Sequence, residues 1–174
     1  MEQKYVMAAI DAALKAGGKI LSIYNDPASD FEIERKADNS PLTIADRKAH
    51  EAIVAILNDT PFPVLSEEGK HLGYEIRRGW DTLWIVDPLD GTKEFIKRNG
   101  QFTVNIALSY QHKSVMGVIY VPVTGELYYA AQGQGAYLDT KDETGKKLQV
   151  SGCTDIHELR MVMSSSHGCE QMDK

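Results

Sequence analysis

Two aspartates, Asp87 and Asp90, stand three positions apart in the segment VDPLDGT, directly after the apolar run TLWIV. Pro88 fixes the backbone φ angle between them, and Gly91 lets the chain turn. Such a turn offers two carboxylates and the Leu89 carbonyl oxygen to one small volume. Mg²⁺ is a hard cation that prefers oxygen ligands of this kind, so the spacing indicates a Mg²⁺ site.

Further acidic residues stand where predicted elements begin or end. Glu67 and Glu68 follow the run PVLS, and Asp46 opens a helical segment. Element ends are where rigid scaffolds present chemistry, and a pair of metal ions activates water and neutralises a leaving oxygen. A glycine that leads into a helix, as after Asp90, also aims backbone N–H groups at a phosphate.

The same residues have simpler structural interpretations. Asp87 and Asp90 are also typical of a turn followed by a helix N-cap, and Asp46 is typical of a helix cap. Glu67 and Glu68 are also typical of a solvated loop. The residue pattern by itself leaves both interpretations open.

Composition limits the class of protein. The chain has 174 residues, of which 43% are hydrophobic and 25% are charged, and a formal net charge of −6. This is typical of a globular domain with a sizeable core, and it argues against a nucleic acid polymer as partner, which usually requires a basic protein. No apolar run approaches the roughly 18 residues of a transmembrane segment. Cys153 and Cys169 form no CxxC pair and are expected to be reduced thiols of a cytosolic protein.

Helical periodicity dominates the first part of the chain. Apolar residues recur on one face over residues 2–24, despite a Gly-Gly pair within the segment. A second helix is predicted after Thr43, because Thr-Ile-Ala-Asp46 resembles a capping box with Asp in place of the usual Glu.

After the second helix, the chain becomes rich in β-branched and aromatic residues, in runs separated by turn-forming segments. Strands are predicted at residues 31–35, 62–66, 82–86, 102–108, 114–121, 126–131 and 160–164, with a turn at 36–41. QHK and VTG suit hairpin turns, and KDETGKK (141–147) is expected to be an exposed loop. Two helices followed by hairpin-linked strands predict an α+β fold, with helices packed on a largely antiparallel sheet.

Three segments resemble the inositol monophosphatase superfamily of Mg²⁺-dependent, lithium-sensitive phosphatases. They are KADNSPLTIAD (36–46), LSEEG (65–69) and WIVDPLDGTKEFIKRNGQFTVNIAL (84–108), and the similarity extends to SSSH (164–167). After the D-P-[IL]-D-G-T pattern, Lys-Glu-Phe is similar to bacterial 3'(2'),5'-bisphosphate nucleotidases of sulfate assimilation, whereas inositol monophosphatases proper usually continue with Thr-Asn-Phe. The resemblance implies removal of the 3'-phosphate of 3'-phosphoadenosine 5'-phosphate (PAP), which gives AMP and phosphate.

The resemblance also implies the metal ligands. Glu67, Asp87 and the Leu89 carbonyl would hold a first Mg²⁺, and Asp87 with Asp90 would contribute to a second, within a complete site of two or three ions.

Catalytic and substrate-binding roles follow from the same resemblance. Thr92 and Asp46 would orient and deprotonate a water held by the metal, which Glu67 would help to position. The implied substrate-binding residues are the backbone N–H groups of Gly91 and Thr92, together with Lys36 and with His167, accompanied by Ser165 or Ser166.

One feature departs from the family pattern. Relatives continue into a second half with a Trp-Asp motif, whose Asp completes the second metal site, yet no Trp follows Trp84 here, and Asp155 and Asp173 lie in other contexts. We therefore expect residues 1–160 to form the N-terminal metal-binding catalytic domain, and residues 161–174 to begin a C-terminal α/β domain that is otherwise absent. On this expectation, the chain alone binds one Mg²⁺ weakly and has little or no activity.

Other functions share parts of this pattern. An inositol monophosphatase-type sugar phosphatase has the same phosphate chemistry, and the sequence does not rank PAP, PAPS and inositol phosphates. A haloacid-dehalogenase-type phosphatase needs aspartates two apart, whereas Asp87 and Asp90 are three apart. A metal- or nucleotide-binding module without turnover is the non-enzymatic alternative. Relatives imply a cytoplasmic location, or a peripheral one at the inner membrane, and the sequence indicates no oligomeric state.

Overall fold

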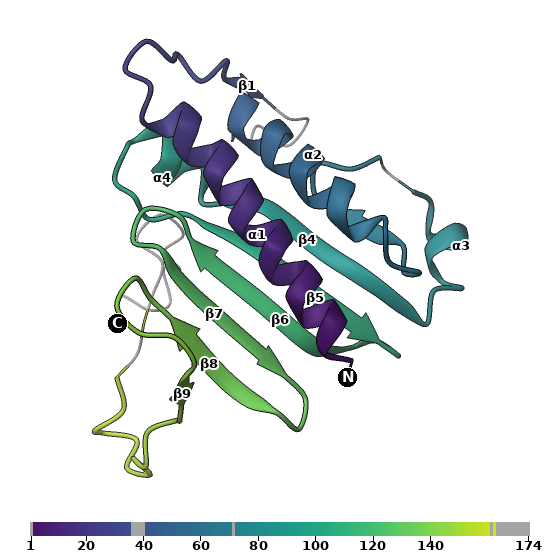
Figure 1. The fold of residues 1–174 in the computed structure, drawn as a ribbon, viewed down its shortest axis with the longest axis vertical. Helices are drawn as coiled ribbons and strands as arrows, with labels where there is room; N and C mark the ends of the chain where they lie inside the picture. The colour runs from purple at the N-terminus through teal and green to yellow at the C-terminus, as the bar shows by residue number, and fades with distance from the viewer. Residues whose placement is uncertain (1, 36–40, 71, 161, 163–174) are drawn as a thin grey trace.

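The computed structural model describes residues 2–35, 41–70, 72–160 and 162. Two long helices, α1 (Gln3–Tyr24) and α2 (Ile44–Leu57), lie side by side across one face of a sheet (Figure 1). Two short helices, α3 (Tyr74–Arg77) and α4 (Thr92–Ile96), stand in the connections before and after strand β4. None of the described helices has the length and apolarity needed to cross a bilayer.

The sheet has seven strands in sequential order. Their bounds are β3 (Val64–Ser66), β4 (Thr82–Asp90), β5 (Thr103–Tyr110), β6 (Lys113–Val121), β7 (Glu126–Ala131), β8 (Gly135–Asp139) and β9 (Lys146–Leu148). Only β3 and β4 pair in parallel, and every later pair is antiparallel. This arrangement confirms the prediction of an α+β fold built on a largely antiparallel sheet.

Helix α1 approaches its neighbours closely because the middle of its buried face is made of small residues. Ala9, Ala12, Ala13 and Ala16 are fully buried against α2 and the sheet. Gly17 extends this face: a Cβ atom there would stand 2.2 Å from Cε1 of a tyrosine on β6. The glycine pair therefore does not end the helix, and one of its members permits the contact between α1 and the sheet.

Helix α2 begins at the predicted capping box. The Thr43 backbone N–H donates to Asp46 Oδ2 at 2.7 Å, and the Ala45 N–H donates to the Thr43 hydroxyl at 3.2 Å. Both Thr43 and Asp46 are almost fully buried. This reciprocal cap satisfies the N–H groups of Thr43 and Ala45 and fixes the Asp46 carboxylate in place.

The core lies between the helices and one face of the sheet. Alternate residues of the central strands, such as Trp84, Ile106 and Val118, point into this core and are at most 1% exposed. The Trp84 indole N–H donates to the Thr60 hydroxyl at 2.8 Å, which satisfies its one polar atom. Trp84 is therefore a packing residue of the core.

Several predicted elements differ from the structure. In the segment 31–35, only Glu34–Arg35 form a strand (β1), which pairs with β2 (Pro41–Leu42), because Phe31 and Glu32 adopt positive φ angles that turn the chain. The predicted turn at 36–41 lies outside the described residues except for Pro41.

The C-terminal strands were also predicted incompletely. The loop predicted at 141–147 is wrong at its end, since Lys146 and Lys147 belong to β9, which pairs with the unpredicted strand β8. Arg160 and Val162 are not in a strand, and the rest of the predicted strand 160–164 lies outside the described residues.

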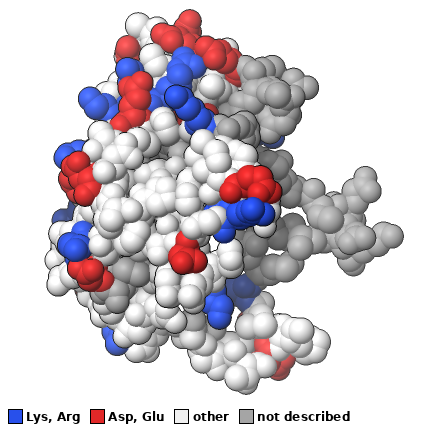
Figure 2. Space-filling model, turned by 90° about the vertical axis from the view of Figure 1, so that its right-hand side faces the viewer, with Lys and Arg blue, Asp and Glu red and all other residues white. Residues whose placement is uncertain are grey.

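Charged side chains of both signs are interspersed on the surface. Figure 2 shows one face of the molecule, on which Lys and Arg alternate with Asp and Glu around a large uncharged area. Among the described residues that are visible there, basic groups do not form a continuous stripe. This distribution gives no support to binding of a nucleic acid backbone on that face.

Candidate active site

The candidate site forms where β4 leaves the sheet. Its pairing with β5 is regular as far as Asp87 and Asn105, and it resumes one residue out of step at Asp90 and Thr103. The extra residue makes a β-bulge, which re-aims the strand end. Within the bulge, the Leu89 N–H donates to Asp87 Oδ1 at 3.2 Å, so the aspartate side chain stabilises the turn that follows it.

Gly91 completes the turn with a φ angle of +92°, which favours glycine. The space is also closed to any side chain, because a Cβ atom there would lie 2.9 Å from the Gln101 carbonyl oxygen. The next residue, Thr92, begins helix α4. The sequence prediction that a glycine leads from the aspartates into a helix is therefore confirmed.

The structure brings Thr92 and Asp46 together across 46 positions of the sequence. The Thr92 hydroxyl lies 3.1 Å from Asp46 Oδ1 and 3.3 Å from the Leu89 carbonyl oxygen, so its single proton has two acceptors. Asp46 Oδ2 is already bound by the Thr43 N–H and, at 2.5 Å, by the Thr43 hydroxyl. Only Oδ1 of Asp46 therefore faces Thr92.

The Asp46 carboxylate is balanced between two opposing effects. Burial raises its pKa, because the charged form loses hydration, while the hydrogen bonds from Thr43 and Thr92 stabilise the charged form and lower the pKa. Burial is the larger effect, so the pKa of Asp46 stands above its ordinary value. The prediction that Asp46 caps a helix is confirmed, and the same geometry places it beside Thr92.

Asp87 lies in an environment that opposes its ionisation. Burial raises its pKa first, and the negative charges of Glu67 and Asp90 raise it further, to about 7. A hydrogen bond with Glu67 acts in the same direction, because the neutral acid donates it. Glu67 is held at this position by its backbone N–H, which donates to the Val86 carbonyl at 3.0 Å and continues the parallel pairing of β3 with β4.

These carboxylates fit a divalent cation in their chemistry. In the part of the chain that the structure describes, no group of three or more His, Cys, Asp or Glu side chains is already arranged as a metal site. Asp87 nevertheless lies close enough to Glu67 and Asp90 for their charges to raise its pKa. Carboxylate oxygens that repel one another are the hard ligands that Mg²⁺ prefers, and a cation between them would relieve the repulsion.

The structure also places polar residues that the sequence analysis did not single out. Asn105 donates from Nδ2 to Asp90 Oδ2 at 3.0 Å, and His50 Nδ1 lies 2.8 Å from the hydroxyl of Ser66, the residue before Glu67. The signal available for Asn105 was a polar residue inside the apolar alternation of a central strand, where asparagine is disfavoured. No local signal in the sequence paired His50 with Ser66.

Other residues of the sequence analysis are not part of this cluster. Lys36 and His167, with Ser165 and Ser166, lie outside the described residues. Asp155 is exposed and its side chain accepts from the His157 N–H, which is a local turn contact. Asp173 lies outside the described residues.

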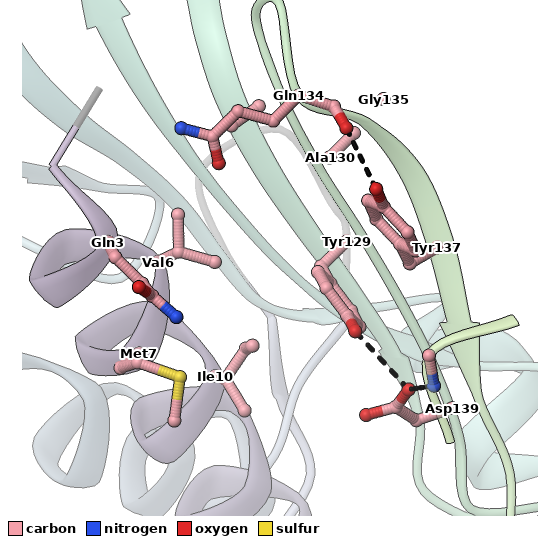
Figure 3. A pocket seen from close by; sticks show the side chains of 12 residues that line it. Gln3, Val6, Met7, Ile10, Tyr129, Ala130, Gln134, Gly135, Tyr137 and Asp139 are labelled. Atoms are coloured by element: carbon pink, nitrogen blue, oxygen red, sulfur yellow. Dashed lines mark hydrogen bonds between the residues drawn. The ribbon is translucent and has the colours of Figure 1, made fainter. Parts of the chain in front are cut away.

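A separate hollow of about 590 Å³ lies between the N-terminal half of α1 and strands β7 and β8. In Figure 3, Val6 and Ile10 face Tyr129 and Tyr137, whose rings stack with centroids 5.6 Å apart. The Tyr129 hydroxyl lies 3.4 Å from a carboxylate oxygen of Asp139. Glu67, Asp87 and Asp90 do not line this hollow, which lies toward the β9 end of the sheet.

Comparisons with known proteins place the chain in a family. The profile of the inositol monophosphatase family matches residues 1–173. The chain is 47% identical over 162 residues to the 3'(2'),5'-bisphosphate nucleotidase CysQ of Salmonella typhimurium. The matched residues make up 92% of this chain and 63% of that relative. The chain thus spans about three fifths of the length of such curated relatives.

Solved structures show the same relationship. CysQ from Bacteroides thetaiotaomicron, described as a bacterial member of the inositol monophosphatase family, is 65% identical, with a TM-score of 0.76 over 88% of this chain and 60% of that one. The extragenic suppressor protein SuhB from Bartonella henselae is 34% identical, with a TM-score of 0.70 over 86% and 55%. Since the family profile matches nearly every residue, this chain belongs to the inositol monophosphatase family.

Proposed function

We propose that this chain carries the metal-binding part of a 3'(2'),5'-bisphosphate nucleotidase, which removes the 3'-phosphate of PAP and releases AMP. The observation that carries the proposal is the 3.1 Å contact between Thr92 and Asp46, because the same Thr92 hydroxyl lies 3.3 Å from the carbonyl oxygen of Leu89, the residue whose N–H binds Asp87. This contact brings a proton acceptor, Asp46, to the end of the strand that carries the potential cation ligands. The substrate is proposed from the names of relatives that are 47% and 65% identical.

Thr92 and Asp46 form a path for one proton. When the Thr92 hydroxyl oxygen accepts a proton from water, its own proton passes to Asp46 Oδ1, the only Asp46 oxygen that Thr43 does not bind. Burial makes the Asp46 carboxylate more basic than an exposed aspartate, which favours proton uptake. The two hydrogen bonds from Thr43 stabilise the charged form of the Asp46 carboxylate and fix its orientation.

The proposed ligands of a first divalent cation are Glu67, Asp87 and the Leu89 carbonyl oxygen, and Asp87 with Asp90 would contribute to a second. The family is generally metal-dependent, and we propose that the ion here is Mg²⁺ and that Li⁺ inhibits by competing at the same place. Once bound, the cation would supply activation of a water and neutralisation of the leaving oxygen. Before that, the chain's own contribution is to hold mutually repelling carboxylates in one place.

Gly91 and Thr92 are the proposed receivers of the phosphate. The first N–H groups of a helix have no partner within it, and those of α4 follow directly after the aspartates. Lys36 and His167 remain proposed contacts to the substrate, and residues 161–174 remain the proposed start of a further domain.

A second candidate is a sugar phosphatase that acts on inositol phosphates. It is favoured by the family profile itself, which is named for that activity and matches residues 1–173. Both candidates use the same carboxylates and the same Thr92–Asp46 pair. They differ in the groups that recognise the part of the substrate beyond the phosphate.

Phosphate release tests the proposal. We expect the chain alone to release little or no phosphate from PAP, because phosphoryl transfer depends on complete positioning, and the relatives are longer. The decisive protein is a fusion of residues 1–160 with the remaining C-terminal part of the 65% identical Bacteroides CysQ.

The fusion should hydrolyse PAP with Mg²⁺, lose activity on addition of Li⁺, and lose it again on Asp87→Asn. Faster release from inositol 1-phosphate than from PAP would favour the second candidate. PAP binding without phosphate release would instead favour a non-catalytic binding module.

A further inference from the structure

Asn105 is the one described residue that neighbours both aspartates of the bulge through strand pairing and a side-chain bond. Its Cα atom pairs with Asp87 in the β4–β5 ladder. Its side chain reaches across the bulge, where Nδ2 donates to Asp90 Oδ2 at 3.0 Å. One amide thus ties the end of the bulge to the strand beside it.

A second residue determines which way this amide points. The Thr103 hydroxyl donates to Asn105 Oδ1 at 3.0 Å, and Thr103 is itself the strand partner of Asp90. With the hydroxyl on Oδ1, the NH₂ group must face Asp90, whereas the reversed amide would set its oxygen against a carboxylate. Thr103, Asn105 and Asp90 therefore form a short chain with one favourable orientation.

This contact suits a cation ligand better than a simple brace. Asp90 is exposed at the end of β4, so its carboxylate would otherwise rotate freely in water. The amide holds Oδ2 and leaves Oδ1 available. Because an amide is neutral, it fixes the carboxylate and leaves its negative charge intact. A lysine in the same place would cancel that charge.

We propose that Asn105 is a positioning residue that orients the Asp90 carboxylate to bind a divalent cation, and that Thr103 sets the orientation of Asn105. The inference rests on the proposed function, because it requires that Asp90 binds the cation. It also explains why an asparagine, a residue that is depleted in strands, stands in a central strand beside Asp87.

Mn²⁺ titration of the 174-residue chain, followed by calorimetry and by the EPR signal of the free ion, tests this role. Asn105→Leu should weaken Mn²⁺ binding about tenfold or more, as the loss of a partner that orients a ligand usually does. Thr103→Val should cause a smaller loss, and Thr103→Ser, which keeps the hydroxyl, should restore the affinity. Thr124→Val is the matched control, since it removes a hydroxyl-to-carboxylate bond (to Glu126) in the turn between β6 and β7.

Thermal unfolding in EDTA separates positioning from a structural role. A purely structural brace would lower the melting temperature of the metal-free protein and leave the Mn²⁺ affinity of the folded protein unchanged. Equal affinity in Asn105→Leu and the unaltered chain would overturn this inference and leave the proposed metal site intact. If the unaltered chain bound no Mn²⁺ at millimolar concentration, the proposed site and this inference would both be wrong.

Discussion

Asp87 is held where its charged form is disfavoured. The carboxyl is partly buried and faces the negative charges of Glu67 and Asp90, so the folded protein raises its pKa to about 7. An apolar or amide side chain would be more stable in this place. Residues that break local rules in this way concentrate at functional sites, where a ligand later compensates the unfavourable contact.

Replacing Asp87 with Asn should therefore stabilise the metal-free chain while weakening cation binding. The amide removes the repulsion, and its oxygen still accepts from the Leu89 N–H, as Asp87 Oδ1 does. At pH 8 in EDTA, urea unfolding should show a gain of about 1–2 kcal/mol, below the full value of the pKa shift because the group is partly solvated. Mn²⁺ affinity should fall at least about tenfold.

Asp81→Asn is the matched control for that measurement, because it removes an exposed carboxylate just before β4. We expect it to change the free energy of unfolding by no more than about 0.5 kcal/mol. A loss of stability in EDTA for Asp87→Asn would contradict the view that its carboxylate is held against repulsion.

Thr92 allows a test of the proton path. Thr92→Ser keeps the hydroxyl 3.1 Å from Asp46 Oδ1, whereas Thr92→Val keeps the shape and removes the hydroxyl. In the fusion with the Bacteroides C-terminal part, kcat should stay within a few-fold for the Ser variant and fall about 100-fold for the Val variant. Similar kcat values for the two variants, at equal Mn²⁺ affinity, would remove Thr92 from the proton path.

Local signals explain which elements the sequence could predict. The capping box at Thr43 and the alternating strands around QHK and VTG depend on neighbouring residues, and the structure confirms them. Strands β8 and β9 are short and partly polar, so their pairing depends on a register that no local pattern encodes. The same applies to Asn105 and Asp90, whose contact depends on a bulge between two strands.

The candidate site divides in the same way. The turn from Asp87 to Gly91 follows from proline, glycine and aspartate in sequence, and it could be predicted from residue types alone. The contact between Thr92 and Asp46 joins a helix start to a strand end 46 positions away. This contact forms only after two helices and the sheet have packed together, and no local pattern of residues encodes that packing. Only the family resemblance therefore predicted it.

The packing of α1 on β6 gives opposite predictions for two adjacent glycines. At Gly18 nothing lies within 4 Å of an added Cβ atom, so Gly18→Ala should stabilise the helix by about 0.5–1 kcal/mol. At Gly17 the new atom would stand 2.2 Å from Tyr120 Cε1, and the strain should exceed that gain, for a net loss of about 1–3 kcal/mol.

Urea unfolding of the two variants measures both effects. Adding Tyr120→Ala to Gly17→Ala should recover part of the loss, since it removes the clashing ring. If Gly17→Ala were as stable as Gly18→Ala, the tight contact between α1 and β6 would be wrong.

The two faces of the sheet differ in how far solvent reaches their apolar side chains. Helices α1 and α2 cover one face, whereas the other carries Ile85 and Ile119, which are 43% and 47% exposed. Strand alternation places Asp87 on the same side as Ile85. The carboxylates therefore stand beside a partly solvated apolar surface, and their charge state should influence the stability of the entire domain.

That influence has a definite sign. In the unfolded chain the pKa of Asp87 is near 3.8, and in the folded, metal-free chain it is about 7, so the folded chain holds the proton more tightly. The stabilising contribution of this protonated group is complete below pH 3.8 and is lost as the pH rises through about 7. A bound divalent cation takes the place of that proton, so its effect on stability should grow as the proton leaves.

We therefore expect Mn²⁺ to raise the melting temperature of the chain more at pH 8 than at pH 6. At pH 6 the cation must displace a proton from Asp87, whereas at pH 8 it meets a carboxylate that is already ionised and repelled. Thermal unfolding in EDTA and in saturating Mn²⁺ at both pH values gives the comparison, and Asp87→Asn should show a small, pH-independent shift. An equal Mn²⁺ shift at the two pH values in the unaltered chain would mean that the cation binds without competing for this carboxylate.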